Sequence, residues 1–288
     1  MSGRPRAIAG APISWGVCEV PGWGAQLPPE RVLAEMRGAG LTATEFGPDG
    51  YLPDAAGAKA ALLASYGLRA VGGFVPVVLH DAAADPMPDV ERSLAAFAAT
   101  GATTLVLAAA TGRDGYDARP GLDAAAWRLL LDRLDTIAAR AADDGVTATL
   151  HPHVGTIVET TAEVDRVLDG SAIALCLDTG HLLVGGTDPV ALAERVPGRI
   201  AHAHLKDVDA RLAADVRAGR RPYSEAVRDG MFRPLGAGDI DIARVVRALD
   251  AAGYTGWYVL EQDVMLAGAG EDPLTDVATS IRYLEALP

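Results

Sequence analysis

Short runs of apolar and β-branched residues alternate with longer segments of helical period along almost the whole chain. Each run has the length and composition of a buried strand, and the segments between them repeat apolar residues at the spacing of an amphipathic helix. Eight runs occur, at residues 7–16, 43–47, 70–77, 103–109, 147–153, 173–178, 200–206 and 257–262. Strands that alternate with helices form parallel sheets, and eight such units predict a single (β/α)8 TIM barrel of the α/β class.

The segments between the runs carry the signals of helix ends. Helices are expected over residues 29–39, 90–99, 124–142, 162–168, 189–195, 240–252 and 276–287. Glycine is common in the left-handed position after a helix, and it follows helical segments at Gly40, Gly67, Gly101, Gly145 and Gly253. No linker or low-complexity tract divides the sequence. Residues 1–288 are therefore expected to form one domain, a length that α/β barrels commonly reach.

The regular spacing fails once, after the seventh predicted strand. An inserted segment at about residues 208–238 separates this strand from the next helix, where a short loop is usual. Loops that follow barrel strands form the catalytic face. The insertion, including Arg233, is therefore a candidate cover for a bound substrate, and an ordinary surface helix pair is the alternative.

The charge balance favours a small uncharged partner. Asp and Glu number 38 against 25 Lys and Arg, a net charge of -13 that disfavours binding to nucleic acid or to an anionic membrane surface. No apolar run is long enough to span a bilayer, and the N-terminus lacks the apolar stretch of a signal peptide. Cys18 and Cys176 lie far apart and suggest a reducing compartment. A cytoplasmic location is expected, and whether the chain forms a homo-oligomer stays open.

Titratable residues gather where the predicted strands end, which is the side of a barrel that carries the active site. They occur at or just after the second, third, fifth, sixth, seventh and eighth strands: Glu45, His80, His151, His153, Asp178, His181, His202, His204, Lys206 and Glu261. A divalent ion needs several oxygen or imidazole donors at one point, and this mixture suits Mn, Fe, Co or Zn better than Ca. One donor from each of the last four strands predicts a metal site of His151, Asp178, His204 and Glu261.

Some of these positions have other interpretations. Asp178 could cap the following helix, and His80 and His202 could be satisfied structural histidines. His202 and His204 share one strand face, and His204 lies nearer the strand end. His151 and His153 present the same problem, since either could be the ligand while the other contacts substrate.

A further set of side chains is expected to contact a substrate at the barrel mouth. An aromatic face can pack against a sugar-like ring, and imidazole, ammonium or guanidinium groups can bind its hydroxyls. The predicted substrate contacts are Trp15, His80, His181 and Arg233.

Several motifs resemble those of a known family. Residues 11–16 (APISWG), 44–48 (TEFGP) with 50–53 (GYLP), and 151–156 (HPHVGT) resemble the inosose (2-keto-myo-inositol) dehydratases. Residues 177–181 (LDTGH), 202–207 (HAHLKD), 234–238 (PLGAG) and 261–263 (EQD) resemble the wider group of xylose isomerase-like, sugar phosphate isomerase/epimerase barrels. In much of that group the fifth strand supplies a glutamate ligand, whereas this chain has His151, a departure that favours the dehydratase branch over an isomerase.

The resemblance implies a metal-dependent lyase that dehydrates a cyclic keto-polyol such as 2-keto-myo-inositol through an enediolate. Manganese or cobalt is the expected ion, with magnesium, iron and zinc as alternatives. Glu45 or His153 is the candidate base, and Lys206 or His181 the candidate acid. A metal-dependent ketose epimerase or isomerase is the alternative function. Cleavage of an oxidised C-glycoside and a non-catalytic binding barrel are also considered.

Overall fold

The computed structural model describes residues 6–113 and 115–288, and over these its main sheet is parallel. The strand order is β3-β2-β1-β11-β8-β7-β6-β5-β4. The strands are β1 (Ala7–Gly10), β2 (Ala43–Thr44), β3 (Arg69–Ala70), β4 (Gly72–Val77), β5 (Thr104–Ala109), β6 (Thr147–Leu150), β7 (Ala174–Asp178), β8 (Ile200–Leu205) and β11 (Trp257–Leu260).

The two ends of this order, β3 and β4, are pieces of one stretch that Val71 separates. The Val71 amide donates to the Thr44 carbonyl, and the Val71 carbonyl accepts from the Thr104 amide. The interrupted third strand thus joins the second strand to the fourth, and the sheet closes. The predicted (β/α)8 barrel is confirmed.

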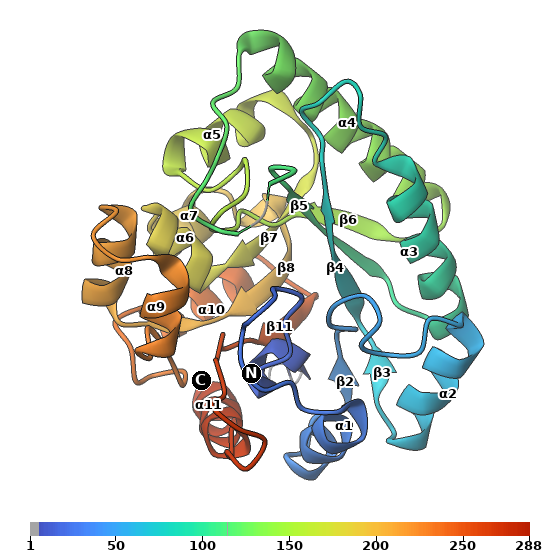
Figure 1. The fold of residues 1–288 in the computed structure, drawn as a ribbon, viewed down its shortest axis with the longest axis vertical. Coiled ribbons are helices and arrows are strands. Elements are labelled where there is room, and N and C mark those ends of the chain that lie inside the picture. Colours follow the sequence, from blue (N-terminus) through green and yellow to red (C-terminus); the bar gives the residue numbers. More distant parts are fainter. Residues whose placement is uncertain (1–5, 114) are drawn as a thin grey trace.

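Helices surround the strands (Figure 1). They are α1 (Pro29–Gly38), α2 (Ala56–Ser65), α3 (Met87–Thr100), α4 (Ala124–Asp143), α5 (Thr161–Gly170), α6 (Thr179–Gly185), α7 (Pro189–Arg195), α10 (Ile242–Ala251) and α11 (Leu274–Ala286). Within the described part of the chain, none of the helices is long and apolar enough to cross a membrane.

The helices and strands share one large apolar core, and a small second cluster consists of Ala9, Ala11, Ala43, Val71 and Val259. Helix α4 buries Trp127, Leu130, Leu134, Ile137 and Ala141, which recur at the spacing of one helix face. All six residues of β5 are buried, because one face of the strand lines the barrel interior and the other packs under helices. This packing holds the strand ends in fixed positions.

The observed elements differ from the prediction at several boundaries. The first strand ends at Gly10, because Pro12 begins the short 3-10 helix η1 (Pro12–Trp15) and Gly16 is left-handed with φ 77°. The second and fifth strands are also shorter than predicted, ending at Thr44 and Leu150. Helix α2 lies before Gly67, where a helix end is predicted without bounds for the helix. Helix α6 occupies a segment for which no helix is predicted, and the 3-10 helix η2 (Pro197–Arg199) precedes β8.

The segment after β8 folds into compact structure of its own. Strand β9 (Asp207–Val208) pairs antiparallel with β10 (Phe232–Arg233), and between them lie helices α8 (Ala210–Arg217) and α9 (Tyr223–Arg228). Asp207 fixes the following loop, because its carboxylate accepts from the amides of Gly236, Gly238 and Ile240. The insertion therefore lies close to the carboxyl ends of the barrel strands.

Gly72 allows the close approach at the point where the barrel closes. A Cβ atom at this position would overlap the Thr104 carbonyl oxygen of the neighbouring strand. We expect Gly72→Ala to lower the free energy of unfolding by about 2–3 kcal/mol, the usual cost of overpacking a core. The control is Gly57→Ala in α2, where a Cβ meets no atom within 4 Å and should stabilise by roughly 0.5–1 kcal/mol. Equal stability of the two variants in urea unfolding would contradict this account.

Candidate metal centre and active site

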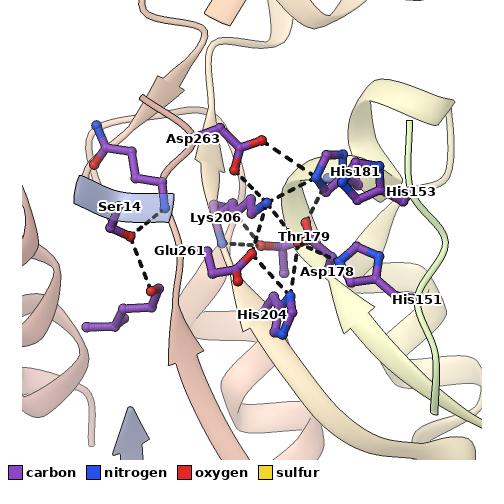
Figure 2. A network of polar contacts seen from close by, with 12 residues as sticks. Ser14, His151, His153, Asp178, Thr179, His181, His204, Lys206, Glu261 and Asp263 are labelled. Carbon is purple, nitrogen blue, oxygen red and sulfur yellow. Dashed lines mark hydrogen bonds and ion pairs between the residues drawn. The ribbon is translucent and has the colours of Figure 1, made fainter. Parts of the chain in front are cut away.

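Four potential ligands meet at the carboxyl ends of β6, β7, β8 and β11. His151, Asp178, His204 and Glu261 each offer a nitrogen or oxygen, and these atoms all lie within 4.8 Å of one another. Figure 2 shows the four side chains pointing toward one another. The structure thus brings together all the residues that were predicted as metal ligands.

The donor atoms are poorly satisfied without an ion. His151 Nε2 lies 3.3 Å from Asp178 Oδ2, and His204 Nδ1 lies 3.2 Å from Glu261 Oε2. Asp178 Oδ2 and His204 Nδ1 are buried and have no hydrogen-bond partner among the described residues. Buried polar atoms are rarely left in this state. Two imidazoles and two carboxylates also suit a divalent transition metal, so the residues fit such an ion.

Glu45 orients the imidazole of His204 through a contact with its Nε2 atom. Its Oε1 lies 3.0 Å from His204 Nε2 and 2.7 Å from His202 Nε2. A carboxylate on one ring nitrogen leaves the other nitrogen facing the metal position. His151 is held in the same way, with Nδ1 2.9 Å from the Pro152 carbonyl. The contacts of Glu45 are those of a group that positions ligands.

Asp178 serves two purposes at the junction of β7 and α6. Its Oδ1 accepts a hydrogen bond of 2.8 Å from the His181 amide and so caps the helix. Its Oδ2 faces the other three donors of the candidate metal site. The two sequence interpretations of this residue, helix cap and metal donor, therefore describe different oxygens of one carboxylate.

Lys206 lies beside the cluster among three carboxylates. Its Nζ is 3.3 Å from Asp178 Oδ2, 3.0 Å from Glu261 Oε2 and 2.7 Å from Asp263 Oδ1. Burial alone would lower the pKa of this ammonium, but the three carboxylates raise it well above its ordinary value. The same ammonium holds the pKa of Asp178 well below its ordinary value, in spite of burial. Lys206 is therefore a charged donor.

The imidazole of His153 is uncharged, in contrast to the nearby Lys206 ammonium. Burial, and then the nearby His151 and Lys206, lower its pKa to about 3. Its Nδ1 lies 2.7 Å from the Val154 carbonyl, so a neutral ring donates there and keeps a lone pair on Nε2. The ring packs on His181 with centroids 3.6 Å apart. His153 is outside the four-donor cluster, which contains His151 instead.

A cavity of about 80 Å³ opens above the cluster. Glu45, His151, His204, Lys206, Glu261 and Asp263 contribute polar surface to it, together with His153. Apolar surface comes from Pro12, Ile13, Val17, Trp23, Phe74 and Tyr116. Such a mixture of apolar walls and a few convergent polar groups is typical of small-molecule sites.

The four predicted substrate contacts lie outside the lining of this cavity. Trp15 is fully buried, and its indole donates to Glu35 Oε2 at 2.8 Å. His181 is buried behind His153 and accepts from Lys206 Nζ at 3.0 Å. His80 follows β4 and is partly buried, and Arg233 lies in β10 of the insertion. Their contact with a substrate stays a prediction.

Asp263 and Tyr223 also belong to the site: the sequence offers Tyr223 only as part of an insertion that could cover a substrate, and Asp263 only as part of the motif at 261–263. Asp263 lies two positions after Glu261, and both carboxylates contact Lys206 Nζ; a second carboxylate so close to a predicted ligand is a signal that could have identified it. Tyr223 donates from its hydroxyl to Asp263 Oδ2 at 2.6 Å. It comes from the insertion, and no spacing in the sequence indicates this contact.

A closed (β/α)8 barrel with histidine and carboxylate donors at four adjacent strand ends defines a class of metal-site barrels, and comparison with known proteins agrees. The family model of the xylose isomerase-like TIM barrel matches residues 33–287. The rhizopine catabolism protein MocC of Rhizobium meliloti is 35% identical over 89% of this chain and 81% of its own length. An inosose dehydratase of Geobacillus thermodenitrificans is 31% identical over 91% of both chains.

Solved structures share the fold at lower sequence identity. The crystal structure of an IOLI protein with a bound zinc atom superposes with a TM-score of 0.71 and 13% identity, covering 96% of both chains. The chain belongs to the xylose isomerase-like TIM barrels and, within them, to the family of the inosose dehydratases.

Proposed function

We propose that this protein is a metal-dependent lyase that removes water from a cyclic keto-polyol such as 2-keto-myo-inositol. The observation that carries the proposal is the buried cluster of four metal donors with a charged lysine and a neutral histidine beside one cavity. The similarity to an inosose dehydratase along 91% of both chains supports the substrate class.

In this proposal His151, Asp178, His204 and Glu261 hold one divalent ion, with manganese or cobalt as the preferred identity. The ion supplies Lewis acidity toward the ketone and an adjacent hydroxyl. Two imidazoles and two carboxylates match the ligand preferences of these metals. Glu45 keeps His204 in the orientation that ligation requires.

His153 removes the proton from the carbon next to the ketone. A base must carry a free lone pair that faces the substrate, and His153 meets this condition because its Nδ1 is engaged by the Val154 carbonyl, its Nε2 stays free and its ring lines the cavity. Glu45 is less suitable, because its Oε1 already contacts the imidazoles of His202 and His204. His153 therefore receives the α-proton as the enediolate forms.

Lys206 supplies the second proton. The electron pair of the enediolate then forms a carbon–carbon double bond, and the β-hydroxyl leaves with a proton from the Lys206 ammonium as water. The acid must be protonated before the step, and Asp263, the carboxylate partner of Lys206 that is not a metal ligand, favours the ammonium at 2.7 Å. One proton thus passes from the α-carbon to His153, and one passes from Lys206 to the leaving oxygen.

The proposal also places the protein in the cytoplasm. Both cysteines, Cys18 and Cys176, are free thiols, which supports a reducing compartment. The expected partner is the small substrate, and whether the chain forms a homo-oligomer stays open.

A substrate screen tests the proposal. Purified protein loaded with Mn²⁺ or Co²⁺ is incubated with keto-inositols and with ketohexoses, and products are followed by mass and ultraviolet absorbance. We expect a keto-inositol to lose the mass of one water and to gain an ultraviolet chromophore. A product of unchanged mass and altered stereochemistry would instead identify an epimerase or isomerase.

A further inference from the structure

Lys206 shares its carboxylate partners with the candidate metal site. Its Nζ contacts Asp178 Oδ2 and Glu261 Oε2, and both carboxylates belong to the four-donor cluster. A divalent ion held there would take up these oxygens and repel the ammonium at short range. Asp263 is then the remaining carboxylate that can hold Lys206, with its Oδ1 2.7 Å from Nζ.

Tyr223 fixes the orientation of Asp263. Its hydroxyl donates to Asp263 Oδ2 at 2.6 Å, while Oδ1 of the same carboxylate accepts from Lys206. Asp263 is 6% exposed and Tyr223 is fully buried, so water competes little for either contact. Hydrogen bonds to a buried carboxylate are among the stronger ones in proteins. With one oxygen held by the phenol, the other faces the lysine.

The inserted segment provides this tyrosine. Tyr223 is the first residue of α9, and its ring packs against Tyr116, His181 and Phe232 with centroid distances of 4.7, 6.0 and 6.3 Å. Phe232 belongs to β10, so the insertion supports Tyr223 from within. The insertion thus contributes a buried hydrogen-bond donor to the site.

We propose that Tyr223 is a positioning residue that, through Asp263, holds the Lys206 ammonium beside the metal ligands, so that a divalent ion and this ammonium occupy the site together. The inference rests on the metal site of the proposed function. It assigns the insertion a specific task, which is to keep the lysine from displacing the ion.

Mn²⁺ binding without substrate tests this inference by equilibrium dialysis. Tyr223→Phe keeps the ring and removes the hydroxyl, so Asp263 holds Lys206 less firmly and the ammonium competes for Asp178 and Glu261. We expect the Mn²⁺ affinity to fall roughly 3- to 10-fold, somewhat less than for a direct partner of a ligand. Asp263→Asn removes the negative charge that holds Lys206 away from the metal ligands, so this variant should lower the Mn²⁺ affinity further. Lys206→Met removes the ammonium itself and should raise the Mn²⁺ affinity.

The matched control is Tyr258→Phe. The Tyr258 hydroxyl donates to Asp250 Oδ1 at 2.8 Å outside the site, so this variant loses the same kind of contact and should bind Mn²⁺ like the parent protein.

A double variant separates positioning from general structural damage. If Tyr223 acts through the ammonium, Tyr223→Phe has no further effect on Mn²⁺ affinity in a Lys206→Met protein. Parental affinity in the single Tyr223→Phe variant, or an equal loss in both backgrounds, would overturn the inference. If the expected binding pattern appears but no keto-inositol is dehydrated by the parent protein, the proposed function fails and the positioning role stands.

Discussion

Asp178→Asn is expected to abolish stoichiometric metal binding and to reduce turnover at least 1,000-fold while the barrel stays folded. Asparagine caps a helix as well as aspartate does, so the contact from Oδ1 to the His181 amide can persist. When the asparagine oxygen accepts from the His181 amide, the position of Oδ2 receives the amide nitrogen, which cannot ligate a metal. Loss of Lewis-acid stabilisation of about 4 kcal/mol corresponds to roughly 1,000-fold in rate.

Asp188→Asn is the matched control for this prediction. Asp188 caps α7 through the amides of Val190 and Ala191 and lies outside the cluster. With metal removed, both variants should unfold at temperatures close to that of the metal-free parent, and with metal added Asp188→Asn should retain metal and activity. Metal content by mass spectrometry and initial rates measure the two effects. An Asp178→Asn protein with a full equivalent of metal and parental turnover would remove Asp178 from the site.

The predicted ligands are found together because the rules that place them are local. A parallel strand in a barrel delivers its last inward residue to one face, so a donor at each of four strand ends is enough to predict a common site. The order His202-Ala203-His204 also predicts two imidazoles on one strand face. Both rings contact Glu45 Oε1 in the structure.

Other features depend on contacts that no local rule specifies. Helix α2 buries only Leu63 of its ten residues, so its pattern of apolar residues is weak. The glycine that follows it, Gly67, indicates a helix end there but does not give the bounds of the helix. Tyr223 reaches Asp263 across 40 positions through an insertion with its own fold. The placement of Trp15 follows from Pro12 and Gly16, which turn the chain into η1 where a continued strand was expected.

His151 and His153 illustrate the limit most clearly. One proline separates them, and alternation along a strand would direct both side chains inward. The strand ends at Leu150, so the two rings are directed by loop contacts instead: Nδ1 of His151 faces the Pro152 carbonyl and Nδ1 of His153 the Val154 carbonyl. Identifying which of His151 and His153 is the metal ligand requires the directions of these two carbonyl groups, and the alternation rule for strands does not predict them.

His153→Gln is expected to lower turnover by roughly 100- to 10,000-fold with metal content unchanged, the usual range for loss of a general base. Glutamine retains a donor for the Val154 carbonyl contact but has no basic lone pair. The loss should fall on proton removal from carbon. In deuterium oxide, this variant should therefore fail both to dehydrate the keto-inositol and to exchange its α-hydrogen.

Lys206→Met gives the complementary result and identifies which proton each residue handles. With the acid absent and His153 intact, the α-hydrogen should still exchange for deuterium while loss of water slows. Because elimination needs both transfers, turnover alone cannot distinguish these roles, whereas exchange measured by proton NMR can. Undiminished α-exchange in His153→Gln would exclude His153 as the base and return that role to Glu45, whose carboxylate also borders the cavity.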